Sequence, residues 1–166
     1  RNDIDVPPLK LAPTHRWVSA GEATSDVQVL TDEEKHDSRP RESDLLWWKD
    51  TPQGESYGKA VAKVRGKESL FQHARLHQSR PAPTLSANSH VFTHWSECRK
   101  LTYREWKRLG SFPDDYHAKT DKIGKYMIGM SVPPKMTEQV ARAVCEQWLN
   151  VNYSELSNDN QAQNPH

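Results

Sequence analysis

Histidine and cysteine side chains, which are common metal ligands, recur at intervals of four residues in the middle of the chain. His73 and His77 form one pair, and His90, His94 and Cys98 form a longer series. Ligands four residues apart can meet on a helix, but the residues around His90 and His94 alternate as in a strand, where such neighbours lie about 13 Å apart. No C-x-x-C pair, typical of structural zinc sites, accompanies them. We therefore predict that the chain binds no metal.

Carboxylate and hydroxyl groups are the next candidates for chemistry. Asp114 and Asp115 could form an acid–base pair, but they follow Pro113 and are therefore more typical of a turn. Ser131 has no base or oxyanion motif beside it, so we do not expect a nucleophile there. The chain has two cysteines, which are too few for a disulfide framework and favour a reduced, cytosolic protein.

The clearest signals for secondary structure lie in the second half of the chain. Thr102 and Glu105 form a T-x-x-E capping box, so a helix should begin there, and Gly110 should end it in the left-handed conformation. Three residues should give this helix a basic rim: Arg104, Lys107 and Arg108. A second, strongly amphipathic helix is predicted over Pro133–Asn150. Its apolar stripe consists of Met136, Val140, Val144 and Trp148.

Signals are weaker in the first half. Ser19 and Glu22 repeat the capping pattern and predict a helix over Trp17–Leu30, followed by a charged linker or exposed loop over Thr31–Asp44. The hydrophobic run Leu45–Trp48 is expected to anchor a core or an interface, with a base-stacking platform as the alternative.

Alternating residues predict two strands. One covers Ala60–Arg65, with Gly66 ending it, and the other covers Ser89–Trp95. The segment Leu70–His77 is compatible with a strand or a turn of helix. The tail from Asn152 to His166 is rich in Asn, Ser and Gln, and we expect it to be disordered.

Composition restricts the class of protein. The 166 residues are enough for one domain with a core, but hydrophobic residues make up only 34% and the mean hydropathy is −0.93. Such a chain either carries flexible segments or buries surface against a partner. No apolar run approaches the roughly 20 residues that span a membrane. No signal peptide is visible, and the first residue is not Met, which suggests a fragment or a processed chain.

Charge is distributed unevenly although the net charge is only +1. Glu22–Asp50 carries nine acidic and four basic residues, a balance of −5. Lys59–Arg80 carries six basic residues and one acidic residue, a balance of +5. This polarity is compatible with a DNA-facing surface, and equally with an ordinary solvated one.

The stretch from Arg99 to Pro134 resembles the last two conserved blocks, IX and X, of the cytosine-5 DNA methyltransferases. Block IX matches as R-x-L-T-x-x-E-x-x-R-L followed by F-P-D-D-Y, and block X as I-G-M-S-V-P-P. Two positions depart from the pattern: Gly110 stands where the family usually has Gln, and Met130 where it usually has Asn. The opening R-N-D-I resembles the segment that closes block VIII.

The resemblance implies roles for individual residues. Met130, Ser131 and Val132 would lie against the S-adenosyl-L-methionine pocket, although the thioether of Met130 cannot make the polar contacts of an amide. Thr84, followed by an aliphatic residue, would lie near the DNA backbone beside the target base. Arg99 is a second candidate DNA contact by motif position. Composition alone adds further candidates: Lys59, Lys63, Arg65, Lys67 and Arg75.

The catalytic motifs of the family are absent from this sequence: Pro-Cys, Glu-Asn-Val, Gln-x-Arg-x-Arg and the Gly-rich cofactor loop. Cys98 follows Glu97, and Cys145 lies on the buried-looking side of the last predicted helix, so neither is a credible nucleophile. We expect the chain alone to be inactive. A truncated gene, a two-subunit enzyme and a recorded fragment all remain open. The alternative function is a non-catalytic, sequence-specific DNA-binding module, and a degenerate structural relic is a third reading.

The sequence therefore predicts an α+β fold. A small recognition domain of short strands and helices would be joined to a C-terminal helix that packs on an absent Rossmann-like, S-adenosylmethionine-dependent domain. We expect a linker and helix at 1–44, a target recognition domain including block IX at 45–118, block X with a return helix at 119–150, and a tail at 151–166. The expected partners are double-stranded DNA and a domain or subunit carrying blocks I–VIII, in a bacterial or phage-type system located in the cytoplasm at the nucleoid.

Overall fold

The computed structural model describes residues 7–12, 16–27, 29–66, 73–87 and 92–149. Its contacts divide the chain into two compact units, one formed by Trp17–Pro133 and the other drawn from Arg1–Arg16 and Pro134–His166. The predicted functional division at residues 44 and 118 stays a prediction.

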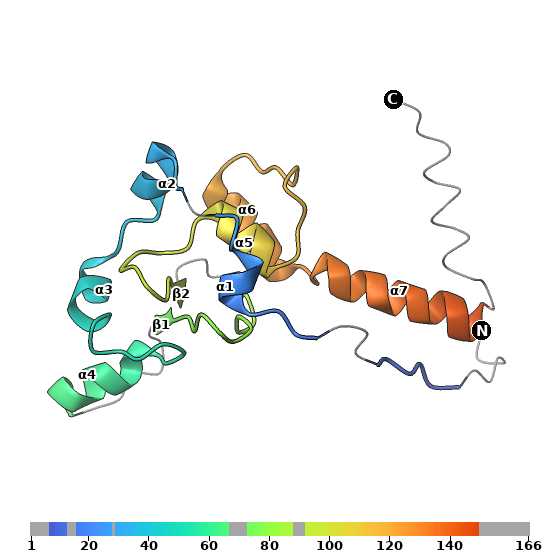
Figure 1. The fold of residues 1–166 in the computed structure, drawn as a ribbon, viewed down its shortest axis with the longest axis horizontal. Helices are drawn as coiled ribbons and strands as arrows, with labels where there is room; N and C mark the ends of the chain where they lie inside the picture. The colour runs from blue at the N-terminus through green and yellow to red at the C-terminus, as the bar shows by residue number, and fades with distance from the viewer. Residues whose placement is uncertain (1–6, 13–15, 28, 67–72, 88–91, 150–166) are drawn as a thin grey trace. The chain divides into compact units, whose positions relative to one another are not determined.

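The larger unit contains short helices and one pair of strands (Figure 1). In chain order its elements are α1 (Ala20–Ala23), α2 (Asp32–Asp37), α3 (Glu42–Trp47), α4 (Tyr57–Arg65), β1 (Ala74–Arg75), β2 (Phe92–Thr93), α5 (Tyr103–Leu109) and α6 (Asp121–Met130). The two strands are parallel, with Ala74 opposite Phe92 and Arg75 opposite Thr93. The predicted α+β class is confirmed.

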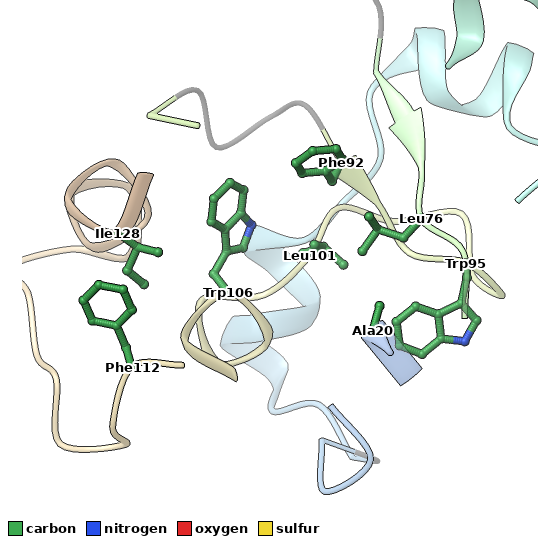
Figure 2. Close-up of a cluster of buried hydrophobic side chains, with 8 residues drawn as sticks. All are labelled: Ala20, Leu76, Phe92, Trp95, Leu101, Trp106, Phe112 and Ile128. Carbon is green, nitrogen blue, oxygen red and sulfur yellow. The ribbon is translucent and has the colours of Figure 1, made fainter. Parts of the chain in front are cut away.

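The core of the larger unit surrounds Trp106 on α5, whose side chain is fully buried. Figure 2 shows Ile128 and Phe112 on one side of the indole, and Leu101 and Phe92 on the other. Because burial of one such side chain stabilises a fold by about 1.5–3 kcal/mol, this cluster holds α5, α6 and β2 together. α5 and α6 accordingly lie side by side in Figure 1.

The capping box at the start of α5 is confirmed. The Thr102 hydroxyl accepts from the Glu105 amide at 3.1 Å, and the Glu105 carboxylate accepts from the Thr102 amide at 2.8 Å. The helix ends at Gly110 as predicted, but the predicted left-handed conformation of this residue is wrong, because its φ is −85°. The left-handed conformation is taken one residue later by Ser111, with φ 58°.

Two predictions for residues 17–44 are wrong. The helix predicted over Trp17–Leu30 is only the four residues of α1, although Ser19 does accept from the Glu22 amide at 3.2 Å. The predicted linker Thr31–Asp44 contains α2 and the start of α3, and a capping box formed by Thr31 and Glu34 opens α2.

The strand predicted over Ala60–Arg65 is helix α4. Its buried residues Tyr57, Ala60 and Val61 follow helical spacing. Gly66 ends it in the left-handed conformation, with φ 69°. The exposed leucines Leu45 and Leu46 do not fill the core, and the two tryptophans that follow them are only half-buried.

The smaller unit consists of α7 (Pro134–Trp148) and an N-terminal segment beside it. The Gln147 side chain accepts from the Lys10 amide at 2.9 Å and donates to the Lys10 carbonyl at 2.7 Å, and the Trp148 indole donates to the Pro7 carbonyl. The predicted helix is confirmed, but Met136 remains 58% exposed. Ala143 is the one buried apolar residue among the described parts of this unit.

Among the helices that the structure describes, none combines the length and apolarity of a membrane span. Several predictions fall outside the described residues: the disordered tail, the first part of the strand Ser89–Trp95 with His90, and the first three residues of the segment Leu70–His77. β2 confirms a strand in the described part of Ser89–Trp95. β1 shows that the described part of Leu70–His77 contains a strand, one of its two predicted alternatives.

Candidate functional site

Arg99 and Glu105 form a buried ion pair beneath the start of α5. The Arg99 guanidinium donates to both Glu105 carboxylate oxygens at 2.8 Å and to the Glu97 carboxylate at 2.6 Å. Burial alone would raise the pKa of Glu105, but the hydrogen bonds and charge of Arg99 outweigh it and hold that pKa below its usual range. Arg99 is only 9% exposed. This geometry gives Arg99 a structural role, and a DNA contact by it stays a prediction.

His94 lies against the same ion pair. Its Nε2 is 3.7 Å from a Glu105 oxygen, and its Nδ1 is 3.3 Å from the amide of Ser96. Because an amide only donates, Nδ1 accepts and the ring proton belongs on Nε2. Burial, and then the positive charge of Arg99, lower the pKa of His94 to about 4. His94 is therefore a neutral core residue at physiological pH.

The basic rim predicted for α5 is largely neutralised inside the fold. Arg104 donates to the Glu34 carboxylate at 2.8 and 3.0 Å, and the guanidinium of Arg108 bonds both Asp26 and Asp114. The third basic residue, Lys107, is buried and donates to the Asp114 carbonyl. These bonds hold α2, the residues before it and the loop after α5 against the helix. They leave little positive charge there for binding DNA.

The candidate DNA contacts chosen on composition have different surroundings. Lys63 and Arg65 are exposed on the second half of α4, while Lys59 pairs with Glu55 at 3.2 Å. Arg75 stacks 3.8 Å from the centre of a Trp48 ring, and its guanidinium bonds backbone carbonyls. That stacking, with the bond from the Trp48 indole to the His94 carbonyl, makes the tryptophan a structural anchor. Lys67 lies outside the described residues.

Other polar groups singled out by type have partners in the fold. The His73 Nδ1 lies 2.6 Å from the fully buried carboxylate of Asp44, which ties β1 to α3. Burial, and then the negative charge of Asp44, raise the pKa of the Cys98 thiol and keep it protonated. Within the described residues, no group of three or more His, Cys, Asp and Glu side chains could hold a metal ion.

Met130, Ser131 and Val132, the predicted cofactor contacts, lie at the end of α6 and immediately after it. All three are exposed, and the Ser131 hydroxyl donates to the Met127 carbonyl at 2.7 Å. The thioether and the isopropyl group offer apolar contact but no charge-bearing or strongly polar group. These residues therefore form an exposed and mainly apolar surface, and their contact with the cofactor stays a prediction.

The structure places the Thr84 segment next to this end of α6. Thr84 is exposed, and the backbone of Ser86 and Ala87 runs so close to Gly129 that no Cβ would fit there. Sequence reasoning missed this contact. Its signal was a glycine inside a helical pattern, which usually has a packing reason.

The chain is similar in sequence to known DNA methyltransferases. Residues 13–146 match the family model for the C-5 cytosine-specific DNA methylases. The chain is 29% identical to the type II methyltransferase M.BbvI of Brevibacillus brevis, over 95% of this chain and 45% of that protein. It is 39% identical to the putative type II methyltransferase M.MJ0563P of Methanocaldococcus jannaschii, over 55% of this chain and 30% of that protein.

A third relative, the type II methyltransferase M.AquIB of a Picosynechococcus species, is 34% identical over 48% of this chain and 66% of that protein. The chain thus spans less than half the length of the first two relatives. No solved structure matches it significantly.

Proposed function

Because the chain belongs to the C-5 cytosine-specific DNA methylase family, we propose that it is the C-terminal, target-recognition portion of a DNA (cytosine-5-)-methyltransferase. The observation that carries this proposal is the contact between the Thr84 segment and the end of α6. The family resemblance gives these two elements a DNA-side role and a cofactor-side role, and the fold holds them together. A cytoplasmic, nucleoid-associated location is part of the same proposal.

The DNA-facing surface would combine Thr84 with the exposed half of α4. Lys63 and Arg65 lie in the last turn and a half of that helix and are both exposed. Such side chains bind phosphates and orient a protein on DNA without reading sequence. Sequence readout would come from polar side chains that reach base edges in the major groove.

The cofactor would supply a methyl group to carbon 5 of a cytosine held out of the duplex. This chain would provide the apolar wall formed by Met130 and Val132, and its contacts would keep that wall facing the base. Catalytic groups would come from a domain or subunit carrying the Pro-Cys and Glu-Asn-Val motifs, because neither motif occurs here.

Exposed apolar side chains indicate where that catalytic part would dock. On α6 the exposed apolar residues follow helical spacing, and on α7 they belong to the predicted stripe. All are at least 40% exposed: Ile123, Tyr126, Met127 and Met130 on α6, and Met136 and Trp148 on α7. Apolar side chains gathered on a helix face in this way are typical of a contact surface. We propose that both helices are covered in the complete enzyme.

Salt-dependent DNA binding tests the recognition role. The full chain is titrated onto a labelled random-sequence duplex at several salt concentrations, with Lys63→Ala/Arg65→Ala compared to the parent. If both residues bind phosphates, the slope of log K against log salt should fall by about 1.8. The control is Lys35→Ala/Arg39→Ala, which removes two exposed basic residues from the acidic region. Equal slopes in all three proteins would contradict the proposed surface.

Reconstitution tests the enzymatic role. The chain is mixed with the catalytic portion of a relative that carries the missing motifs, together with DNA and methyl-labelled S-adenosylmethionine. Labelled DNA is expected from the mixture and from neither part alone. A mixture that forms a complex but leaves the DNA unlabelled would overturn the proposal of a split enzyme.

The absence of every catalytic motif from this sequence favours one second candidate, a non-catalytic DNA-binding module derived from the family. It predicts that the isolated chain prefers some duplex sequences and that S-adenosylmethionine does not change its affinity. A selection from random duplexes that enriches no sequence would count against it.

A further inference from the structure

Two glycines of α6 mark the places where the helix touches its neighbours most closely. A Cβ at Gly124 would lie 2.4 Å from Cζ of Tyr103, and a Cβ at Gly129 would lie 2.2 Å from the carbonyl carbon and oxygen of Ser86. Real Cβ atoms essentially never come within 3.0 Å of such neighbours. The two conflicts differ in kind. A tyrosine ring can rotate away, whereas the backbone at Ser86 can move only if its whole segment moves.

The segment that faces Gly129 is also anchored from the other side. Ala82 and Leu85 pack against the core cluster that contains Ile128 of α6. Thr84 lies between these two anchors and is exposed. Its position therefore depends on two constraints: the core that holds its neighbours, and the side-chain-free surface of α6 that lets Ser86 approach.

We propose that Gly129 is a positioning residue for Thr84, and that this contact couples DNA recognition to the cofactor side of the site. The inference rests on the proposed function. Because Ser86 touches Gly129, and consecutive Cα atoms are 3.8 Å apart, Thr84 and Met130 lie within roughly 15 Å of each other along this path. A displacement of the segment would change how both residues face a shared substrate.

A cycle of two substitutions measures the coupling. Thr84→Ala should weaken binding of the full chain to a labelled duplex about tenfold or more, the effect of one lost hydrogen bond to a charged phosphate. Gly129→Ala should weaken it at least as much, because it displaces Thr84. The double variant should bind no more weakly than Gly129→Ala alone. Independent effects that multiply in the double variant would overturn the inference.

Gly124→Ala is the control in the same helix, because it introduces the same methyl group against the Tyr103 ring instead of the Ser86 backbone. Its steric partner is the Tyr103 side chain and not the backbone of the Thr84 segment, so its effect should multiply with that of Thr84→Ala. A loss of stability alone would couple neither glycine variant to Thr84→Ala, whereas positioning couples only Gly129→Ala. If Gly129→Ala does not fold, Leu85→Ala loosens the same segment without a clash and should show the same coupling to Thr84.

Amide exchange separates this inference from the proposed function. Exchange of residues 82–87 should accelerate about tenfold or more in Gly129→Ala and remain at the parental rate in Gly124→Ala. If the parent binds no DNA but this difference is present, the positioning contact stands and the DNA-binding role fails. If exchange of residues 82–87 is the same in all three proteins, Gly129 does not position the segment.

Discussion

At the scale of single residues, the most consequential group is the Glu105 carboxylate. It is 1% exposed, caps α5, and neutralises Arg99. A buried ion pair contributes little net stability, but removal of one member leaves a charge without compensation in a region of low dielectric. A substitution of Glu105 should therefore lower the stability of the fold even though Glu105 is not a proposed substrate contact.

We expect Glu105→Gln to lower the free energy of unfolding by about 3 kcal/mol. The amide keeps the size of the side chain but removes the buried negative charge, so that only the exposed carboxylate of Glu97 stays paired with Arg99. Urea denaturation of the full chain measures the effect. The control is Glu138→Gln, which breaks the exposed pair with Arg142 on α7 and should cost no more than about 0.5 kcal/mol. Equal losses in the two variants would show that the buried pair has no special role.

His94 makes stability depend on pH. Its folded-state pKa of about 4 lies below the value of about 6.5 expected in the unfolded chain. Between these values the unfolded state binds one more proton than the folded state at His94. A fall in pH therefore favours unfolding. The stability contribution is complete above about pH 6.5 and is lost progressively toward pH 4. Glu105, whose pKa is also lowered, adds a loss in the same direction at the acid end.

The free energy of unfolding should therefore fall by up to about 1.4 kcal/mol per pH unit in this window because of His94. Denaturation curves at a series of pH values measure the slope. His94→Gln should reduce the slope, while the exposed His117→Gln should leave it unchanged. A parental slope that survives in His94→Gln would assign the pH dependence to other groups.

At the scale of elements, the end of α5 is a test of local backbone rules. Gly110 has no need of its conformational freedom, since its φ is −85°. A Cβ there would instead meet Phe112 at 3.0 Å and Ile128 at 3.1 Å. Ser111 takes the left-handed conformation that costs an L-residue about 1–2 kcal/mol. The glycine is thus retained for close packing, and the strained residue follows it.

Opposite effects are expected from two substitutions at this turn. Gly110→Ala should destabilise the protein by about 1–3 kcal/mol, because it overpacks the core. Ser111→Gly should stabilise it by up to about 1 kcal/mol, since relief of strain is partly offset by the greater freedom of glycine in the unfolded chain. Thermal unfolding of both variants checks the signs. Stabilisation by Gly110→Ala would contradict the packing argument.

Elements were predictable where the deciding information is local. The T-x-x-E box of α5 lies within one helical turn, and the apolar residues of α7 recur about once per turn, so both helices were predictable and are confirmed. Residues Ala60–Arg65 by themselves favour a strand, and the helical spacing of α4 becomes visible only when Tyr57 is included. The same capping pattern occurs at Thr31 and Glu34, but the highly charged residues around it favour a linker.

The site was less predictable, because its contacts join residues far apart in the sequence. Nothing in the sequence near Arg104 indicates that it donates to Glu34. Gly129 and Ser86, which pack together, are likewise far apart in the sequence. Motif position did identify Thr84 and the end of α6 as places of interest. It could not show that they touch.

At the scale of the whole molecule, the two compact units differ in what holds them together. The larger unit has a core cluster centred on Trp106. In the described part of the smaller unit, α7 buries only Ala143, and hydrogen bonds to Lys10 and Pro7 join it to the N-terminal segment. A helix of this length is marginally stable in water without packing on an apolar surface.

Hydrogen exchange should reveal this difference and show whether α7 depends on a partner. In the isolated chain, the amides of Pro134–Trp148 should exchange much faster than those of Tyr103–Leu109, because few buried contacts resist their opening. Addition of the catalytic portion of a relative should slow exchange in α7 and in the exposed face of α6, with α5 unchanged as the internal control. Strong protection of α7 in the isolated chain would mean that its apolar stripe is already satisfied, and it would remove the argument that this helix docks on a catalytic domain.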